Sequence, residues 1–186
     1  MLQRAAILEL ILCWIAWTLV FVRARRIAAG QQKVVRAPAS LWGVVLQGIG
    51  FFCVFFRVRP AHLHQAAAPL IASMLLAPSS VALAWAATRH LGKQWRYEAA
   101  LSADHQLIQT GPYRFLRHPI YASMFLLLLA AGFCLTWWPM FLLGIVVFLA
   151  GTEVRVHAEE RLLAAHFPAA YADYRTRTSA YIPFLR

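Results

Sequence analysis

Five apolar runs dominate the chain, and short polar stretches rich in Arg, His and Pro separate them. The runs cover residues 5–22, 41–56, 66–88, 119–135 and 138–152. A helix that spans a bilayer usually needs about 20 apolar residues, so the second, fourth and fifth runs are short for a span. The pattern nevertheless predicts an all-α integral membrane protein with about five transmembrane helices.

Prolines and tryptophans predict how these helices begin, turn and bend. The fourth and fifth runs lie almost end to end, and only the sequence TWWP breaks them. Pro139 suits a first helical turn, and Trp137 and Trp138 suit the membrane interface. We therefore expect the fourth and fifth helices to form a tight hairpin. Within the third run, Pro69 and Pro78 predict a bent or broken helix.

The composition is typical of a membrane protein. Of the 186 residues, 61% are hydrophobic and 13% are charged, whereas a soluble domain is about 45–50% apolar and about 25% charged. Five helices use most of the chain, so we expect one domain over residues 1–186, with three spans in residues 1–88. The three cysteines lie inside apolar runs, and His62 and His64 stand as an isolated pair, so no metal site is predicted.

The net charge of +11 comes from basic residues beside the apolar runs. With five spans, 15 Lys and Arg residues fall on one side of the membrane and 3 on the other. Because basic loops face the cytoplasm, we expect the N-terminus outside and the C-terminus inside. Residues 89–118 and 153–186 then share the cytoplasmic face and can build one site. The lipid bilayer accounts for the charge, and no nucleic-acid recognition module is visible.

The sequence GPYRFLRHPIYAS, residues 111–123, precedes and enters the fourth run. Proline is tolerated at the first helical position, so the helix is expected to begin at Pro119. Arg117 and His118 then lie at a helix N-terminus, where free amides and the helix dipole favour an anion. Tyr121 falls on the first turn and can face the same pocket. The alternative is that Arg117 binds lipid phosphate and Tyr121 belongs to the interface belt.

A second polar group follows the fifth run in the sequence EVRVHAEERLL. Separations of four and three residues place Glu153, His157 and Glu160 within one broad face of a helix. Ionisable groups beside membrane spans tend to mark sites. The alternative is the solvated face of an amphipathic helix at the membrane surface, and we expect such a helix in the cytoplasmic C-terminal region.

The tail alternates aromatic and basic residues in YADYRTRTSAYIPFLR. An arginine there can grip an acidic substrate, because guanidinium binds a carboxylate through two parallel bonds. A peripheral membrane anchor explains the same pattern. The chain has no G-x-G-x-x-G dinucleotide fingerprint, P-loop, H-E-x-x-H or G-x-S-x-G sequence, so the chemistries that these motifs carry are not indicated.

Three motifs in order, DHQLIQTGPYRFLRHPIYAS, AEERLLAAHFPAAYADY and RTRTSAYIPFLR, closely resemble the isoprenylcysteine carboxyl methyltransferase family of integral membrane enzymes. The resemblance covers about residues 89–186. It implies a helix bundle that binds S-adenosyl-L-methionine on the cytosolic side and methylates a lipophilic substrate entering from the membrane. Residues 89–186 would then form the cofactor-binding and catalytic half. Phospholipid N-methyltransferases share the R-H-P-x-Y and paired-glutamate signatures but generally diverge in the tail.

The resemblance also implies roles for individual residues. The implied cofactor-binding residues are Gly111, Pro112, Tyr113, Arg117, His118, Tyr121, Glu159 and Glu160. Glu160 and Arg177 are the implied catalytic residues, with Arg177 placed near the substrate carboxylate. Ser123 stands where the family often has glycine, and its hydroxymethyl group is expected to narrow the approach of a neighbouring helix.

Simple chemistry agrees with carboxyl O-methylation of an isoprenylcysteine-like acceptor. A helix N-terminus suits the carboxylate of S-adenosylmethionine, and glutamates suit its ammonium and hydroxyl groups. A carboxylate acceptor is already ionised, whereas an amine acceptor must lose a proton to a base such as a glutamate or His157. The alternatives are a phospholipid N-methyltransferase, an NADPH-dependent membrane reductase and a scaffold without catalytic activity.

Overall fold

The computed structural model describes residues 1–28, 35–36, 40–56, 66–95, 100–101 and 106–183, so His62 and His64 lie outside the described residues. The helices are α1 (Leu2–Ile27), α2 (Ser40–Phe56), α3 (Ala67–Leu91), α4 (Pro119–Leu135), α5 (Trp138–His166) and α6 (Pro168–Arg177). The other described elements are the 3-10 helices η1 (Gly92–Gln94) and η2 (Gly111–Arg114) and the antiparallel strands β1 (Val35–Arg36) and β2 (Ala100–Leu101).

All five apolar runs are helical, which confirms the predicted helical fold apart from the short strand pair. Helices α1 and α5, and α3 together with η1, are long and apolar enough to cross a membrane. Helices α2 and α4 are shorter, with 17 residues each. Helix α5 continues past Thr152, the predicted end of the fifth run, as far as His166.

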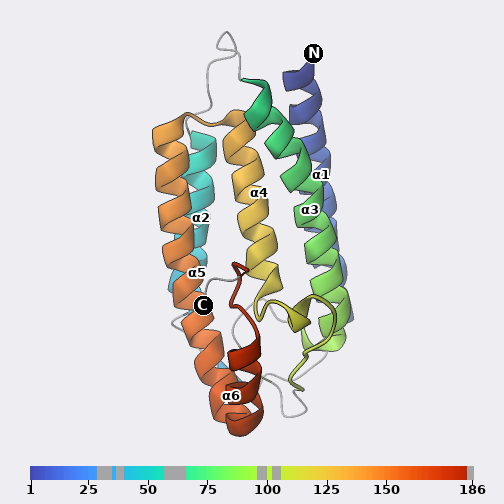
Figure 1. Cartoon of the computed structure of the whole chain (residues 1–186), viewed down its shortest axis with the longest axis vertical. Helices are drawn as coiled ribbons and strands as arrows, with labels where there is room; N and C mark the ends of the chain where they lie inside the picture. The colour runs from blue at the N-terminus through green and yellow to red at the C-terminus, as the bar shows by residue number, and fades with distance from the viewer. Residues whose placement is uncertain (29–34, 37–39, 57–65, 96–99, 102–105, 184–186) are drawn as a thin grey trace.

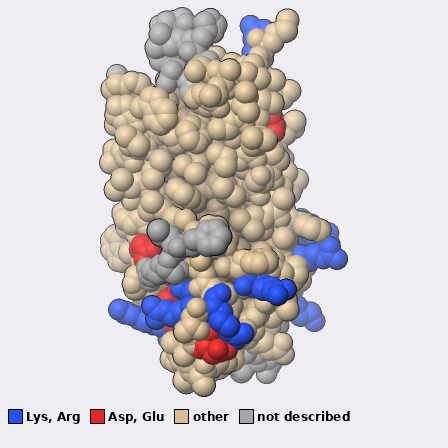
Figure 2. Space-filling model, viewed as in Figure 1, with Lys and Arg blue, Asp and Glu red and all other residues tan. Residues whose placement is uncertain are grey.

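The helices form an elongated bundle in which successive members run in opposite directions (Figure 1). Helix α2 packs along α5, α3 packs along α4, and α1 packs mainly against α3. The N-terminus lies at the end of the bundle opposite α6. Lys and Arg side chains gather toward the α6 end, whereas the middle of the visible face carries few charged side chains (Figure 2).

Glycines bring α2 and α5 into close contact. A Cβ atom at Gly50 would lie 2.8 Å from the carbonyl oxygen of Gly144, and one at Gly43 would lie 2.6 Å from that of Gly151. The seven-residue spacing on both helices places the two pairs on one face, since seven residues make about two turns. Small residues allow helix backbones to approach closely inside membranes. These glycines therefore set the distance between the two helices.

The link between α4 and α5 is as short as the sequence predicts, so the two helices are the arms of a hairpin. They pack mainly against other helices, α4 against α3 and α5 against α2. At the link, Thr136 Oγ1 donates to the carbonyl of Val54 at 2.6 Å. Farther along, the rings of Phe125 and Phe148 stack at 5.9 Å between α4 and α5. Long side chains therefore join the two arms, which leaves space between them toward the basic end.

Pro69 and Pro78 predicted a bent or broken helix, and α3 is not broken, since it is continuous through Pro78. Proline removes one backbone hydrogen bond and costs about 3 kcal/mol inside a helix. Packing of α3 against α1 and α4 outweighs this cost. Two buried serines add bonds to α4: Ser73 Oγ donates to the carbonyl of Ala130, and Ser80 Oγ donates to that of Ser123, each at 2.8 Å.

The tail returns from α6 to lie beside the start of α4. Leu116 and Ser179 form a parallel bridge. The amides of Arg117 and His118 donate to the carbonyls of Ser179 and Ala180, each at 2.8 Å. The last described residues are therefore attached to the segment that the sequence singled out as a candidate site.

The glycine contacts lead to a stability prediction. Gly50→Ala places a methyl group against the backbone of α5, so we expect it to reduce the free energy of unfolding by about 1–3 kcal/mol. Gly48→Ala is the matched control, because a Cβ atom there meets nothing within 4 Å. Thermal unfolding in detergent measures both variants. Equal melting temperatures would contradict a role for the close approach.

Candidate active site

Gly111 shapes the turn that leads into the site. Its φ of 61° lies in the left-handed region that favours glycine. A Cβ atom there would lie 2.3 Å from the ring of His90, whose Nδ1 is 2.7 Å from the carbonyl of Ala86. Pro112 follows at the start of η2, and the buried Tyr113 accepts a hydrogen bond from Tyr174 Oη at 2.6 Å. This turn is therefore anchored to both α3 and α6.

Helix α4 begins at Pro119, as predicted, and His118 caps it. The amides of Arg117 and His118 do not point to open space, because the tail carbonyls accept from both. The expected anion site on these two amides is thus occupied by the chain itself.

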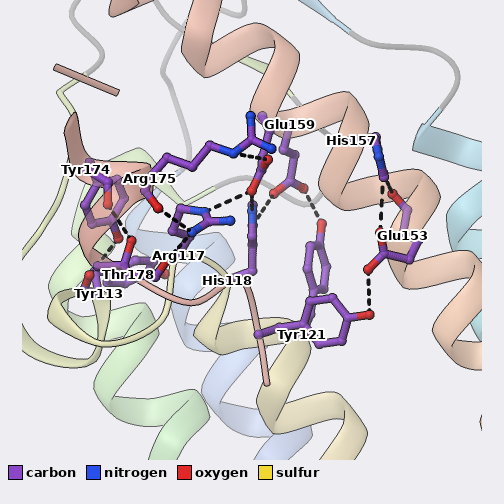
Figure 3. A network of polar contacts seen from close by, with 12 residues as sticks. Tyr113, Arg117, His118, Tyr121, Glu153, His157, Glu159, Tyr174, Arg175 and Thr178 are labelled. Atoms are coloured by element: carbon purple, nitrogen blue, oxygen red, sulfur yellow. Dashed lines mark hydrogen bonds and ion pairs between the residues drawn. The ribbon is translucent and has the colours of Figure 1, made fainter. Parts of the chain in front are cut away.

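Arg117 is almost fully buried and joins three segments (Figure 3). Its Nε donates to Glu160 Oε1 at 2.9 Å, and only 2% of the Arg117 side chain and 8% of the Glu160 side chain are exposed. Its Nη1 also donates to the carbonyls of Arg175, at 3.3 Å, and Thr178. The guanidinium holds α4, α5 and the tail together.

The ring of His118 lies between Glu160 and Glu159, the second of which is labelled in Figure 3. Its Nδ1 is 3.4 Å from Glu159 Oε2, and its Nε2 is 3.4 Å from Glu160 Oε1. Burial by itself would lower the pKa of His118, but hydrogen bonds and charge from the two carboxylates outweigh it and raise the pKa. The two carboxylates therefore stabilise the protonated form of the imidazole.

Tyr121 continues this cluster along α4. Its ring stacks on His118 with 5.7 Å between centroids, and its hydroxyl donates to Glu159. The Arg155 guanidinium lies over the same ring, 4.9 Å from its centroid. Sequence reasoning missed Arg155, although an arginine just beyond an apolar run was a usable signal.

Glu153 and His157 form a separate cluster (Figure 3), although helical spacing places them on one broad face with Glu160. His157 Nδ1 is 3.5 Å from Glu153 Oε2, and Tyr181 Oη donates to Glu153 Oε1 at 2.7 Å. The side chains of Glu153 and His157 are 36% and 55% exposed. Glu153 and Glu160 are seven residues apart, about two helical turns, and they meet different tail residues, Tyr181 and Arg175 respectively.

The tail arginine Arg177 is not brought into the cluster. Its side chain is 62% exposed and pairs with Asp173, one turn earlier on α6. Arg175 lies closer, with its Nε 3.8 Å from Glu160 Oε2. The implied contact of Arg177 with a substrate stays a prediction.

Arg117, His118, Tyr121 and Glu159 form a polar cluster. A cavity of about 480 Å³ extends from this polar cluster into the bundle. Its polar lining comes from Gln47, Tyr113, Arg117, His118, Tyr121, Arg155 and Glu159, among others. Its apolar lining includes Trp14, Trp17, Val44, Phe51, Ile120 and Met124. Gly48 also lines the cavity and is exposed, so the cavity reaches the outer surface beside α2.

Ser123 lies behind the apolar wall of this cavity and is fully buried. Its hydroxyl donates to the carbonyl of Ile120 at 2.7 Å and accepts from Trp17 Nε1 at 3.4 Å. The side chain thus connects α4 to α1 through a cavity-lining tryptophan.

Comparison with known proteins adds three findings. Residues 70–165, more than half of the chain, match the model of the isoprenylcysteine carboxyl methyltransferase family. A stretch of 83 residues is 30% identical to Protein-S-isoprenylcysteine O-methyltransferase of Saccharomyces cerevisiae. This stretch makes up 45% of this chain and 35% of the yeast protein. This chain therefore matches only about a third of the length of that curated relative.

The structure resembles that of a eukaryotic intramembrane Ras methyltransferase, an isoprenylcysteine carboxyl methyltransferase. The TM-score is 0.55 with 20% identity, over 95% of this chain and 68% of the other, which indicates a shared fold. With the apolar helices, these matches identify an integral multi-pass membrane protein. The resemblance found in the motifs is confirmed: the chain belongs to the isoprenylcysteine carboxyl methyltransferase family.

Proposed function

We propose that the chain transfers a methyl group from S-adenosyl-L-methionine to the carboxylate of a lipophilic, isoprenylcysteine-like acceptor. The observation that carries this proposal is one cavity with a polar cluster at its start and an apolar wall beyond it, in a member of this family. The proposed acceptor likewise has a polar carboxylate and an apolar chain. The opening beside Gly48 lies among apolar helices, which suits entry from the bilayer.

We further propose five membrane crossings in a single domain, with the N-terminus outside and α6 on the cytoplasmic side. The alternating helix directions and the basic residues at the α6 end support this topology (Figures 1 and 2). A helix of 17 residues is about 26 Å long, and local thinning of the bilayer accommodates such a length. Residues 1–88 then supply three spans, and residues 89–186 supply the cofactor-binding and catalytic half.

The residues around the cavity fit S-adenosyl-L-methionine. Glu159 lines the cavity with 26% of its side chain exposed, and its carboxylate can accept from ammonium and ribose hydroxyl groups. His118 and Tyr121 hold that carboxylate, while Gly111, Pro112 and Tyr113 shape the adjoining turn. Arg117 lines the cavity and Glu160 does not, and both support the site because each is bonded to the other and to its neighbours.

When bound, S-adenosyl-L-methionine supplies a methyl group on a positively charged sulfur. The protein then needs mainly to orient the acceptor and keep water away, since a carboxylate acceptor requires no base. Of the bases suggested for an amine acceptor, His157 is exposed and is not among the residues that line the cavity, whereas Glu159 lines it. This placement leaves a glutamate as the base that an amine acceptor would need.

The function is tested by label transfer. Purified protein in detergent, given S-adenosylmethionine with a labelled methyl group and a prenylated cysteine analogue, should form a product that loses its label in mild base, as an ester does. Phosphatidylethanolamine serves as the second acceptor. Base-stable label on phosphatidylethanolamine alone would establish the N-methyltransferase instead. Stabilisation by NADPH without any response to S-adenosylhomocysteine would establish the reductase.

Glu159→Gln tests the cofactor contact. It removes the negative charge that faces the cavity but keeps the size of the side chain, so we expect binding of S-adenosylhomocysteine to weaken about tenfold or more. Isothermal titration calorimetry measures the dissociation constant. Arg161→Gln, an exposed change on the same helix, is the control and should bind normally. An unchanged constant in Glu159→Gln would remove Glu159 from the cofactor site.

Gly48→Phe tests the place of the lipid chain. A Cβ atom at Gly48 meets nothing within 4 Å, so a large side chain at this point of the cavity lining should take volume from a long acceptor. We expect KM to rise about tenfold for a fifteen-carbon prenyl chain and much less for a five-carbon chain. Gly48→Ala is the matched control. Equal changes for both chain lengths would contradict this placement.

A further inference from the structure

A row of aromatic rings on α1 forms one side of the cavity. Trp14, Trp17 and Phe21 all line it, and separations of three and four residues place them on one face of the helix. The ring centroids of Trp17 and Phe21 are 4.4 Å apart, and Phe21 lies 5.9 Å from Trp95, which also lines the cavity. Trp14 meets Phe51 of α2 edge-on at 5.4 Å. Trp17 is therefore the middle member of this row.

The indole N–H of Trp17 has a defined acceptor. Its Nε1 donates to Ser123 Oγ at 3.4 Å, and this bond joins α1 to a fully buried residue of α4. Apolar contacts are not directional, whereas a hydrogen bond favours one orientation of the ring. A tryptophan N–H that loses its partner in apolar surroundings also costs free energy. The bond to Ser123 therefore fixes which way the indole of Trp17 faces.

Ser123 is oriented to accept this bond. Its own hydroxyl donates to the carbonyl of Ile120 at 2.7 Å. A hydroxyl has one proton and two lone pairs, so the bond to Ile120 leaves a lone pair for the indole. The backbone carbonyl of Ser123 in turn accepts from Ser80 Oγ at 2.8 Å, which attaches this turn of α4 to α3. Helices α3 and α4 thus present the hydroxyl of Ser123 to α1.

The contact between Trp17 and Ser123 lies beyond the polar cluster, toward the interior of the bundle. Ser123 comes five residues after His118, which is about 8 Å along α4. Ile120 and Met124, on either side of Ser123 in the sequence, line the same cavity as Trp17. An acceptor with its carboxylate at the polar cluster would extend its hydrocarbon chain past this point. The position of the indole then determines how much of the cavity is open to the chain.

We propose that Trp17, oriented by Ser123, limits the length of the hydrocarbon chain that the cavity accepts. This inference rests on the proposed function and deepens it, because it names the residues that select among acceptors. The indole contacts the chain, and its hydrogen bond to Ser123 keeps the ring from turning aside for a longer one. Ser123 touches no acceptor atom and acts through Trp17 as a positioning residue.

The test measures KM for S-prenyl cysteine analogues with fifteen-carbon and twenty-carbon chains, using the full-length protein in nanodiscs and labelled S-adenosylmethionine. In the wild type, KM for the longer chain should be higher by about tenfold or more. Trp17→Ala should bring this KM ratio close to one, because the missing ring leaves room. Ser123→Ala should lower the ratio by about threefold or more, the factor that one net hydrogen bond supplies. Within each variant, kcat for the two chains should change by the same factor, since the polar cluster is intact.

Ser73→Ala is the matched control. Ser73 is also a buried serine whose Oγ donates to a carbonyl of α4, that of Ala130 at 2.8 Å, but it is not among the residues that line the cavity. Its removal should lower the melting temperature and leave the wild-type KM ratio unchanged.

Trp17→Phe covers the case in which Ser123→Ala does not fold, because it keeps an aromatic ring but removes the N–H, and it should also lower the KM ratio. Adding Ser123→Ala to Trp17→Phe should then change the ratio no further, since the bond is already absent. If the two substitutions act additively, or if each keeps the wild-type ratio, the inference is wrong and the proposed function stands. The same holds if the wild type methylates both chains with equal KM. If the wild type methylates neither analogue, both are overturned.

Discussion

The buried contact between Arg117 and Glu160 is the interaction on which the rest of the site depends. It joins residues 43 positions apart, and the same guanidinium also holds the carbonyls of Arg175 and Thr178. Removing one partner of a buried ion pair leaves an uncompensated charge and costs about 3–5 kcal/mol. The segment before α4, helix α5 and the tail therefore meet at this one group, beside His118 and Glu159.

The glycine contacts between α2 and α5 explain how a small helix bundle can contain a large cavity. These helices approach closely at Gly43 and Gly50, so α5 is positioned by α2 rather than by its hairpin partner α4. Aromatic side chains fill the space between α4 and α5 near their link. Toward the basic end the space remains open and receives the polar cluster and Arg155.

Much of the fold and part of the site follow from local features of the sequence. Apolar length predicts the five long helices, and Pro119 marks the start of α4. Pro78 predicted a bent or broken helix, but packing of α3 against α1 and α4 keeps the helix continuous. Glu159, Glu160, His118 and Tyr121 do come together, as the motif resemblance implies. Arg177 does not join them, because its nearest ion partner is Asp173 on the exposed face of α6.

The sequence by itself determined the helices, the family and the segments that carry the site, because hydrophobic length, proline position and motif order are readable along the chain. Only the tertiary structure decided which polar groups meet. Glu153 and Glu160 share a helix face, yet one pairs with His157 and Tyr181 and the other with Arg117. Arg155 faces the cavity because α2 supplies Gly43 and Gln47 beside it. Helical periodicity defines a face, and the neighbouring segments determine what that face contacts.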